Sequence, residues 1–380
     1  MGWSLFRRKT LVLALLAVWG IGNQAFAEAP VQVQAPVSSS VQPLPPAASV
    51  LPPEVHALTW EDHPKVRQAL AYYLGPGRAW VERCLERAEP YRDFIHMRLE
   101  QAGMPDDLFW LVAVESGFNA AATSRAGAAG LWQFMKNSVD GYGMEIGTFV
   151  DQRRDWWKAT DGAIQKLKDN YRVLGDWDLA LAAYNAGLGR MQYILRKAHG
   201  ERNYWRLLDR GLLPRETAGY VPQLVALARI SSHWASWGFP VSWNPSPVWS
   251  RIHLERMIDL RLLADAASVP VEDLRAANPE LRSYLTPALR HGYDLKVLAQ
   301  WVDPLEKALS DPHLKLIRYY LYPIHSGDTL SEIALWYGVS MPMIEHNNPG
   351  LDRSRLKIGK VLVIPAMRDV GPYRNGESRG

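Results

Sequence analysis

Glu115 is the residue whose position in the sequence most directly suggests chemistry. It follows the apolar run 108–114, and helical spacing over 105–116 places it in the last turn of a buried helix. Burial raises the pKa of a carboxyl group, and the negative end of the helix dipole also disfavours an anion. We therefore expect Glu115 to be protonated near neutral pH, the form that can protonate a leaving-group oxygen. The alternative is a structural glutamate that a hydroxyl or an arginine satisfies.

Three downstream segments contain side chains of the kind that line sugar sites. The small residues at 127–130 let a backbone and a substrate approach closely, and GLWQF then places the amide of Gln133 between two aromatic rings. Amide groups beside aromatic faces are typical of ligand pockets. The other candidates are Tyr184 and Asn185 in AAYNAG, and Glu216 and Tyr220 in ETAGYVP.

The sequence around Glu115 lacks a second nearby acid. The next acidic residue is Asp140, whereas glycosidases ordinarily place one carboxylate on each side of the scissile bond. A single-acid mechanism is one explanation. The other is a second carboxylate from distant sequence, with Asp151, Asp155 and Glu216 as candidates.

The elements that must position these residues are predicted to be helices. Apolar residues recur every three or four positions without an alternating strand pattern, which predicts an all-α domain over 54–238 with its core motifs at 105–230. Glycines lie where helices are expected to end. The helical segments are 63–74, 77–103, 105–117, 159–175, 177–187, 189–200 and 216–238.

An internal repeat follows the linker at 240–250. Residues 263–281 match residues 333–351 without gaps at a constant offset of 70. Each copy predicts two helices and then Asn-Pro, and strand-like segments flank the second copy. We expect two small α+β modules, at 251–302 and 320–366.

The two ends of the chain have a different character. A basic start, an apolar centre and Ala-Phe-Ala at 25–27 predict a secretory signal peptide at 1–27, with an uncleaved anchor as the alternative. A Pro- and Ser-rich linker at 28–53 and a disordered tail at 367–380 are also expected. Cleavage after Ala27 would take the net charge from +4 to +1, so a nucleic-acid partner is not expected.

The single cysteine and the motif inventory limit the chemistry further. Cys84 cannot form an intrachain disulfide and is interpreted as a buried structural thiol. No cysteine near the cleavage site offers a lipoprotein anchor. The chain has no metal-ligand or phosphate-loop motif, so neither a metal nor a cofactor is expected.

Taken together, these motifs resemble the lytic murein transglycosylase family, and the D-type membrane-bound subfamily in particular. The resemblance is carried by ESGF, ATSRAGAAGLWQFM, AYNAG and ETAGYVP in that order, and residues 322–365 resemble a LysM module. It implies a mainly α fold, with a lysozyme-like all-α catalytic domain followed by LysM-type α+β modules. The 251–302 copy lacks the SGDTL entry and is interpreted as a degenerate LysM-like module.

The resemblance also implies roles for individual residues. Glu115 matches the catalytic acid/base. The implied substrate contacts are Ser124, Gln133, Met135, Tyr184, Asn185, Glu216 and Tyr220, and the implied glycan contacts of the LysM module are Gly327, Asp328, Thr329 and Asn348. Lys136 departs from the family pattern, which has proline after GLWQFM.

The implied activity is cleavage of peptidoglycan between N-acetylmuramic acid and N-acetylglucosamine. The C6 hydroxyl of the muramoyl sugar attacks, a 1,6-anhydro end forms, and no water is consumed. The implied location is the periplasm, with peripheral membrane contact left open. Two alternatives remain at this stage: a non-catalytic glycan-binding scaffold, and a hydrolytic lysozyme on the same fold.

Overall fold

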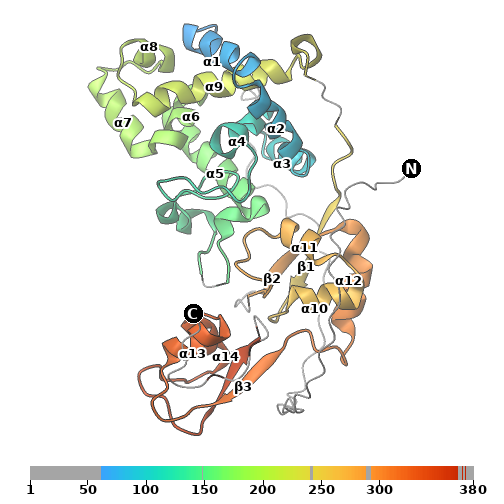
Figure 1. Cartoon of the computed structure of the whole chain (residues 1–380). Helices are drawn as coiled ribbons and strands as arrows, with labels where there is room; N and C mark the ends of the chain where they lie inside the picture. The colour runs from blue at the N-terminus through green and yellow to red at the C-terminus, as the bar shows by residue number, and fades with distance from the viewer. Residues whose placement is uncertain are drawn as a thin grey trace. The chain divides into compact units, whose positions relative to one another are not determined.

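A computed structural model describes residues 61–147, 149–239, 243–287 and 292–366, together with Val370 and Tyr373 (Figure 1). The predicted signal peptide at 1–27, the linker at 28–53 and most of the tail at 367–380 lie outside the described residues. Nowhere in these ranges does a helix combine the length and the apolar character that crossing a membrane requires.

The part of the chain that precedes the linker folds as helices around one hydrophobic core. The core extends from Val66 to Phe239 and is centred on the apolar faces of α4, α5, α6 and α9. Aspartates start α5 and α6 by accepting hydrogen bonds from their first-turn N–H groups. The helices are α1 (Pro64–Leu74), α2 (Arg78–Ala88), α3 (Arg92–Gln101), α4 (Phe109–Ser116), α5 (Trp156–Leu174), α6 (Trp177–Ala186), α7 (Leu188–Lys197), α8 (Tyr204–Asp209) and α9 (Arg215–Ser231).

The helix predictions hold with three corrections. The segment 77–103 is two helices, because Pro90 removes a backbone donor and blocks a continuous helix between α2 and α3. The short helix α8 was not predicted; Asn203 starts it by accepting a hydrogen bond from the Arg206 N–H. The segment 216–238 is helical only to Ser231, before a short turn at Ala235–Trp237.

Two copies of a strand–helix–helix–strand unit follow. The first contains β1 (Trp249–Leu254), α10 (Leu260–Ala267), α11 (Val271–Ala277) and β2 (Tyr293–Leu298), and α12 (Val302–Ser310) packs against it. The second contains β3 (Tyr319–Pro323), α13 (Leu330–Tyr337), α14 (Met341–Asn347) and β4 (Val361–Pro365). Both strand pairs are antiparallel. Each helix of the second copy begins and ends 70 positions after its counterpart, as the repeat predicts. The sequence predicts flanking strands only for the second copy, where they are β3 and β4; the corresponding strands of the first copy, β1 and β2, were missed.

Each unit has its own buried cluster. Ile252, Leu263 and Leu295 are among the buried residues of the first, and Ile333, Ile344 and Leu362 among those of the second. Val150 belongs to the first cluster although it lies in the chain segment between α4 and α5. The first unit with its helix α12, residues 249–316, is called the middle unit. Because Val150 packs in its cluster, the middle unit and the helical domain are in contact.

Candidate active site

Helix α4 positions Glu115 at its C-terminal end. The side chains of residues 109–113 are all buried, which fixes the rotation of the helix in the core. Gly117 ends the helix in the left-handed conformation, with a φ of 58°, and donates its N–H to the Ala113 carbonyl. Glu115 itself is partly buried. The prediction of a carboxyl in the last turn of a buried helix is therefore confirmed.

The Tyr220 hydroxyl of α9 donates a hydrogen bond to Glu115 Oε1. Burial raises the pKa of Glu115 to about 7, against the lowering effects of the Tyr220 bond and the Lys166 charge; the Glu216 charge adds to the rise. A carboxyl group with such a pKa can give up and recover a proton near neutral pH, as a group that serves as acid and then as base must do.

Lys166 of α5 is a part of the site that sequence reasoning missed. Its Nζ donates to the Tyr184 carbonyl oxygen at 3.1 Å and lies 3.8 Å from the centre of the Tyr184 ring. Burial lowers the pKa of Lys166, and the charge of Glu115 raises it. The sequence signal was weak: Lys166 is three residues after Ala163 and four before Asn170, and both prove to be buried, which places Lys166 on the inward-facing side of α5.

Helices α6 and α9 contribute the remaining polar groups. The buried Tyr184 hydroxyl donates to the Trp132 carbonyl at 2.9 Å. Asn185 Nδ2 donates to Glu216 Oε1 at 3.3 Å, and its Oδ1 accepts from the Thr217 hydroxyl at 2.8 Å. Glu115, Tyr184, Tyr220 and Glu216 are close enough for their charges to affect one another. The structure thus brings together the predicted residues of ESGF, AYNAG and ETAGYVP.

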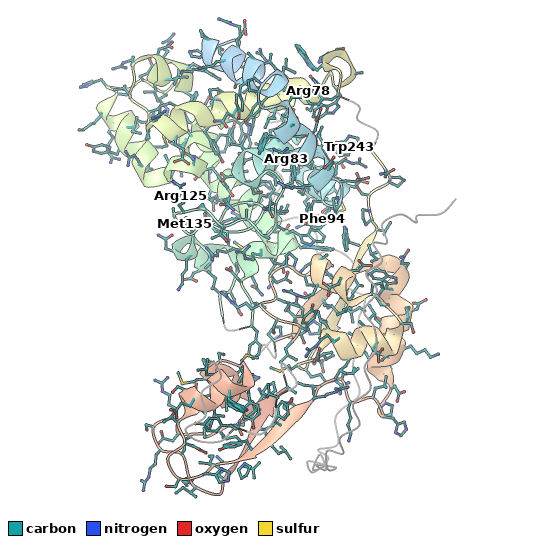
Figure 2. All side chains as sticks on the ribbon, viewed as in Figure 1. Arg78, Arg83, Phe94, Arg125, Met135 and Trp243 are labelled. Atoms are coloured by element: carbon teal, nitrogen blue, oxygen red, sulfur yellow. The ribbon has the colours of Figure 1, made fainter. Side chains whose placement is uncertain are left out.

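The loop between α4 and α5 presents the other predicted residues. Two β-bridges, Thr123 with Ala129 and Ala129 with Phe134, fold residues 122–135 into a tight hairpin, which we call the hairpin loop. Ser124 lies exposed in it, and its Oγ accepts a hydrogen bond from the Ala128 N–H at 3.0 Å. Met135 is 39% exposed, so its side chain is accessible to a ligand (Figure 2).

Gln133 adopts a positive φ of 47°, and its amide nitrogen donates to the Gly130 carbonyl at 2.8 Å. Its side chain is partly buried. A hydroxyl from the end of α4 secures the same loop, because Ser116 Oγ donates to the Leu131 carbonyl at 2.8 Å. Glu115 and the hairpin loop are therefore connected through the adjacent residue.

A buried arginine holds the hairpin loop from the other side. Arg153 Nη1 donates to the carbonyls of Gly127 and Phe134, at 2.6 and 3.2 Å. Two further nitrogens of Arg153 form hydrogen bonds with the Asp151 carboxylate, at 2.9 and 2.8 Å. Asp151 is therefore a structural partner of the hairpin loop.

Two of the three candidates for a distant second acid are engaged in ion pairs. Asp151 is paired with Arg153 at 2.8 Å, and these bonds hold the pKa of the carboxyl below its ordinary value despite burial. Asp155 starts α5 and is paired with Lys296 at 3.0 Å. Glu216 is the candidate that remains exposed near Glu115.

The predicted glycan contacts of the second repeat lie around the start of α13 and the end of α14. Thr329 starts α13, and its Oγ1 accepts a hydrogen bond from the Glu332 N–H. The Asp328 side chain is buried and accepts from the Tyr322 hydroxyl at 2.7 Å, which shapes the loop after Gly327. The Asn348 amide bonds to the Ile344 and Val363 backbones. These four residues stay predictions as glycan contacts.

Two further features bear on the chemistry. Cys84 is buried, and burial raises the pKa of its thiol to about 12, as a structural thiol requires. Across the described ranges, no group of three or more His, Cys, Asp or Glu side chains is arranged to hold a metal ion.

Comparison with known proteins identifies the family. The family model of the transglycosylase SLT domain matches residues 94–205, and that of the LysM domain matches residues 322–365. Membrane-bound lytic murein transglycosylase D of Escherichia coli strain K12 is 31% identical over 321 residues, which cover 80% of this chain and 70% of that protein. This chain belongs to the lytic murein transglycosylase family.

The predicted family, the mainly α fold class with its lysozyme-like catalytic domain, and the assignment as a lytic transglycosylase are thereby confirmed. A putative tributyltin chloride resistance protein of Alteromonas sp. strain M-1 is 36% identical over 106 residues, 28% of this chain and 51% of that protein. The 70 kDa soluble lytic transglycosylase of Escherichia coli matches at 21% identity with a TM-score of 0.35, over 47% of this chain and 32% of that chain.

Proposed function

We propose that this transglycosylase cleaves the β-1,4 bond between N-acetylmuramic acid and N-acetylglucosamine in peptidoglycan and leaves a 1,6-anhydromuramoyl end. The observation that carries the proposal is the environment of Glu115, a carboxyl with a pKa near neutrality beside a tyrosine donor. The engagement of Asp151 and Asp155 in ion pairs supports a single-acid mechanism.

The proposed reaction uses Glu115 twice. Its proton passes to the glycosidic oxygen as the bond from that oxygen to the anomeric carbon breaks. The C6 hydroxyl oxygen of the same muramoyl sugar then bonds to the anomeric carbon, and the Glu115 carboxylate accepts the hydroxyl proton. Glu115 returns to its starting form and no water is consumed. The Tyr220 hydroxyl stabilises the carboxylate between the two transfers by donating a hydrogen bond to it. Lys166 and Tyr184 lie beside the carboxylate and contact each other.

The hairpin loop and the helix ends supply the proposed substrate contacts. Ser124, Gln133 and Met135 would line one side of the glycan, and Asn185, Glu216 and the tyrosines the other. The LysM module at 320–366 would hold the enzyme on the wall through Gly327, Asp328, Thr329 and Asn348. We further propose that the signal at 1–27 exports the protein to the periplasm and that the catalytic domain occupies 54–238.

Mass spectrometry of the muropeptides released from purified sacculi tests the reaction. Anhydromuramoyl ends, with no water gained, are the expected products. Reducing ends would identify a hydrolase instead, and Glu216 would then be the first residue to test as its second carboxylate, since it lies exposed near Glu115. Intact sacculi would contradict a catalytic role altogether.

The pH dependence of kcat/KM is expected to follow the protonation of Glu115. The protonated form begins the reaction, so kcat/KM should fall as the pH rises through about 7. The Lys166 charge lowers the pKa of Glu115 and the Glu216 charge raises it. The pH at which kcat/KM falls should therefore be higher in Lys166→Met and lower in Glu216→Gln than in the unaltered enzyme. Shifts in the same direction in both variants would contradict this assignment.

Removal of the LysM module is expected to separate wall binding from chemistry. A chain lacking residues 322–365 should sediment poorly with sacculi yet cleave short soluble glycan strands at the full-length rate. The control is a thermal unfolding curve, because Met343 of this module packs in one cluster with Met257 and Leu285 of the middle unit. Undiminished sedimentation of a folded truncated chain would rule out the targeting role.

A further inference from the structure

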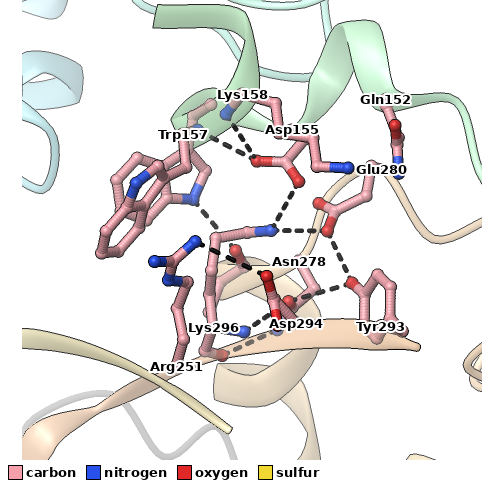
Figure 3. A network of polar contacts seen from close by, with 12 residues as sticks. Gln152, Asp155, Trp157, Lys158, Arg251, Asn278, Glu280, Tyr293, Asp294 and Lys296 are labelled. Carbon is pink, nitrogen blue, oxygen red and sulfur yellow. Dashed lines mark hydrogen bonds and ion pairs between the residues drawn. The ribbon is translucent and has the colours of Figure 1, made fainter. Parts of the chain in front are cut away.

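The middle unit, residues 249–316, contacts the helical domain through a buried ion-pair network (Figure 3). Lys296 Nζ of β2 lies 3.0 Å from Asp155 Oδ2 and 2.6 Å from Glu280 Oε1. The Tyr293 hydroxyl donates to the same Glu280 oxygen at 2.5 Å. The exposed fraction of the Lys296 side chain is 1%, and that of Glu280 is 0%. A charge so completely buried needs compensating partners, and here they come from both units.

Backbone hydrogen bonds continue the contact on either side of these charges. The Asp151 N–H donates to the Glu280 carbonyl, and the Arg282 N–H donates to the Phe149 carbonyl, each at 2.8 Å. Around them, Val150 and Leu281 form a β-bridge. The indole N–H of Trp156 donates to the Ala277 carbonyl at 2.9 Å. The loop after α11 is thus paired with the segment that leads into α5.

The second repeat shows what is particular to this loop. Asn278 and Asn348 occupy equivalent positions, and both bond through their side-chain amides to the second strand of their own unit. The strand residue that bonds to the asparagine is Lys296 in the first copy and Val363 in the second. Two residues after the asparagine, the first copy has the buried Glu280 and the second has the exposed Gly350. The asparagine and its backbone bonds are therefore common to both copies, whereas the ionisable Lys296 and Glu280 occur only in the first.

We propose that the middle unit is a LysM-like module whose loop at 278–282 has become a docking surface for the catalytic domain, with Lys296 as a positioning residue for the active site. One carboxylate oxygen of Asp155 forms the ion pair with Lys296. The other accepts hydrogen bonds from the N–H groups of Trp157 and Lys158 at the start of α5. Helix α5 carries Lys166 beside Tyr184.

A second connection leads from the docked loop to the substrate side. The Asp151 backbone is held by Glu280, and the Asp151 carboxylate orients Arg153. Arg153 in turn donates hydrogen bonds to the carbonyls of Gly127 and Phe134 within the hairpin loop. Loss of the docking contact should therefore loosen both α5 and the hairpin loop, although no side chain proposed to touch the substrate is itself replaced.

Hydrogen exchange and steady-state kinetics on the full chain test the proposal with Lys296→Met. The matched control is Lys307→Met, which removes the same charge from an exposed position on α12 of the same unit. We expect backbone exchange at 147–157 and 123–134 to accelerate by about tenfold or more in Lys296→Met and to stay unchanged in Lys307→Met. The expected loss of kcat is about 10- to 100-fold, since small misplacements of catalytic groups have effects of that size.

A second variant keeps the proposal testable if Lys296→Met fails to fold. Asp155→Asn retains a residue that can start α5 but removes the charge that faces Lys296. It should accelerate exchange at 277–282 and 147–157, and its effect should not add to that of Lys296→Met. Native exchange at 147–157 in both variants, or protection of 278–282 on addition of a soluble glycan, would overturn the docking role.

The effect on kcat rests on the proposed function, whereas the exchange measurement does not depend on it. Hydrolytic products, or no turnover of sacculi by the unaltered enzyme, would contradict the proposed reaction and leave the exchange result to decide the docking. Native turnover of Lys296→Met despite accelerated exchange would overturn the positioning role alone.

Discussion

Replacing Glu115 with glutamine is expected to abolish turnover of sacculi while leaving glycan binding close to that of the unaltered protein. A positioned acid or base contributes about 10²- to 10⁴-fold to a proton transfer, and Glu115 is proposed to serve both transfers. Glutamine has the same shape, and its amide oxygen can still accept the hydrogen bond from Tyr220. Muropeptide release measures turnover, and sedimentation with sacculi measures binding.

The same variant reports on protonation independently of activity. The pKa of Glu115 in the folded state, about 7, lies above its ordinary value of 4.5. Between these values the folded state retains a proton that the unfolded state releases, so Glu115 makes the fold less stable as the pH rises through this window. Glutamine has no such dependence. The Tm of Glu115→Gln should therefore exceed that of the unaltered protein at about pH 8 and match it at about pH 4.

Substantial residual cleavage in Glu115→Gln would rule out the single-acid mechanism. If Glu115→Gln and the unaltered protein had equal Tm values at about pH 8 as well as at about pH 4, the raised pKa of Glu115 would be contradicted. Glu216→Gln provides the comparison, because it removes an exposed carboxylate near the same site. We expect it to retain measurable turnover.

Gly130→Ala is expected to have the largest effect on stability of any single methyl addition in the hairpin loop. A Cβ at this position would lie 1.8 Å from the Arg153 carbonyl oxygen, and the φ of Gly130 is +83°. Backbone atoms cannot yield as a flexible side chain can, so Arg153 would have to move away from Gly127 and Phe134. We expect a loss of about 4 kcal/mol or more in the free energy of unfolding, or failure to fold. Chemical denaturation followed by circular dichroism measures it.

Gly127→Ala is the matched control for this prediction. Gly127 lies in the same loop with a similar φ of +87°, but no atom lies within 4 Å of a Cβ built there. Its cost should be the conformational strain alone, about 1 to 3 kcal/mol. Equal losses in the two variants would show that the close approach of Gly130 to Arg153 contributes nothing beyond φ.

The central acid and its environment could be predicted from the sequence because they depend on local properties. An apolar run of helical spacing specifies a buried helix, and a glycine specifies its end, so the placement of Glu115 follows from neighbouring residues alone. The same holds for the paired helices of the repeat, whose bounds recur 70 positions apart. Lys166 was missed because helical spacing does not reveal which distant residues its side chain will face.

The roles of the other acids were decided by the tertiary structure. Spacing left Asp151, Asp155 and Glu216 as equivalent candidates for a second carboxylate. Two of them are engaged in ion pairs, and the partner of Asp155 lies 141 positions away, at Lys296. A local pattern cannot specify which distant charge will be buried against which, because that depends on how the separately folded units meet.

By itself, the sequence determined the helical fold class, the family through its ordered motifs, and the acid at the end of a buried helix. The tertiary structure alone decided that Tyr220 and Lys166 face this acid, and that an apparently degenerate repeat is docked on the segment leading into α5. The physical reason is the range of the interactions. Helix periodicity acts over a few residues, whereas buried ion pairs join residues that only the folded chain brings within 3 Å.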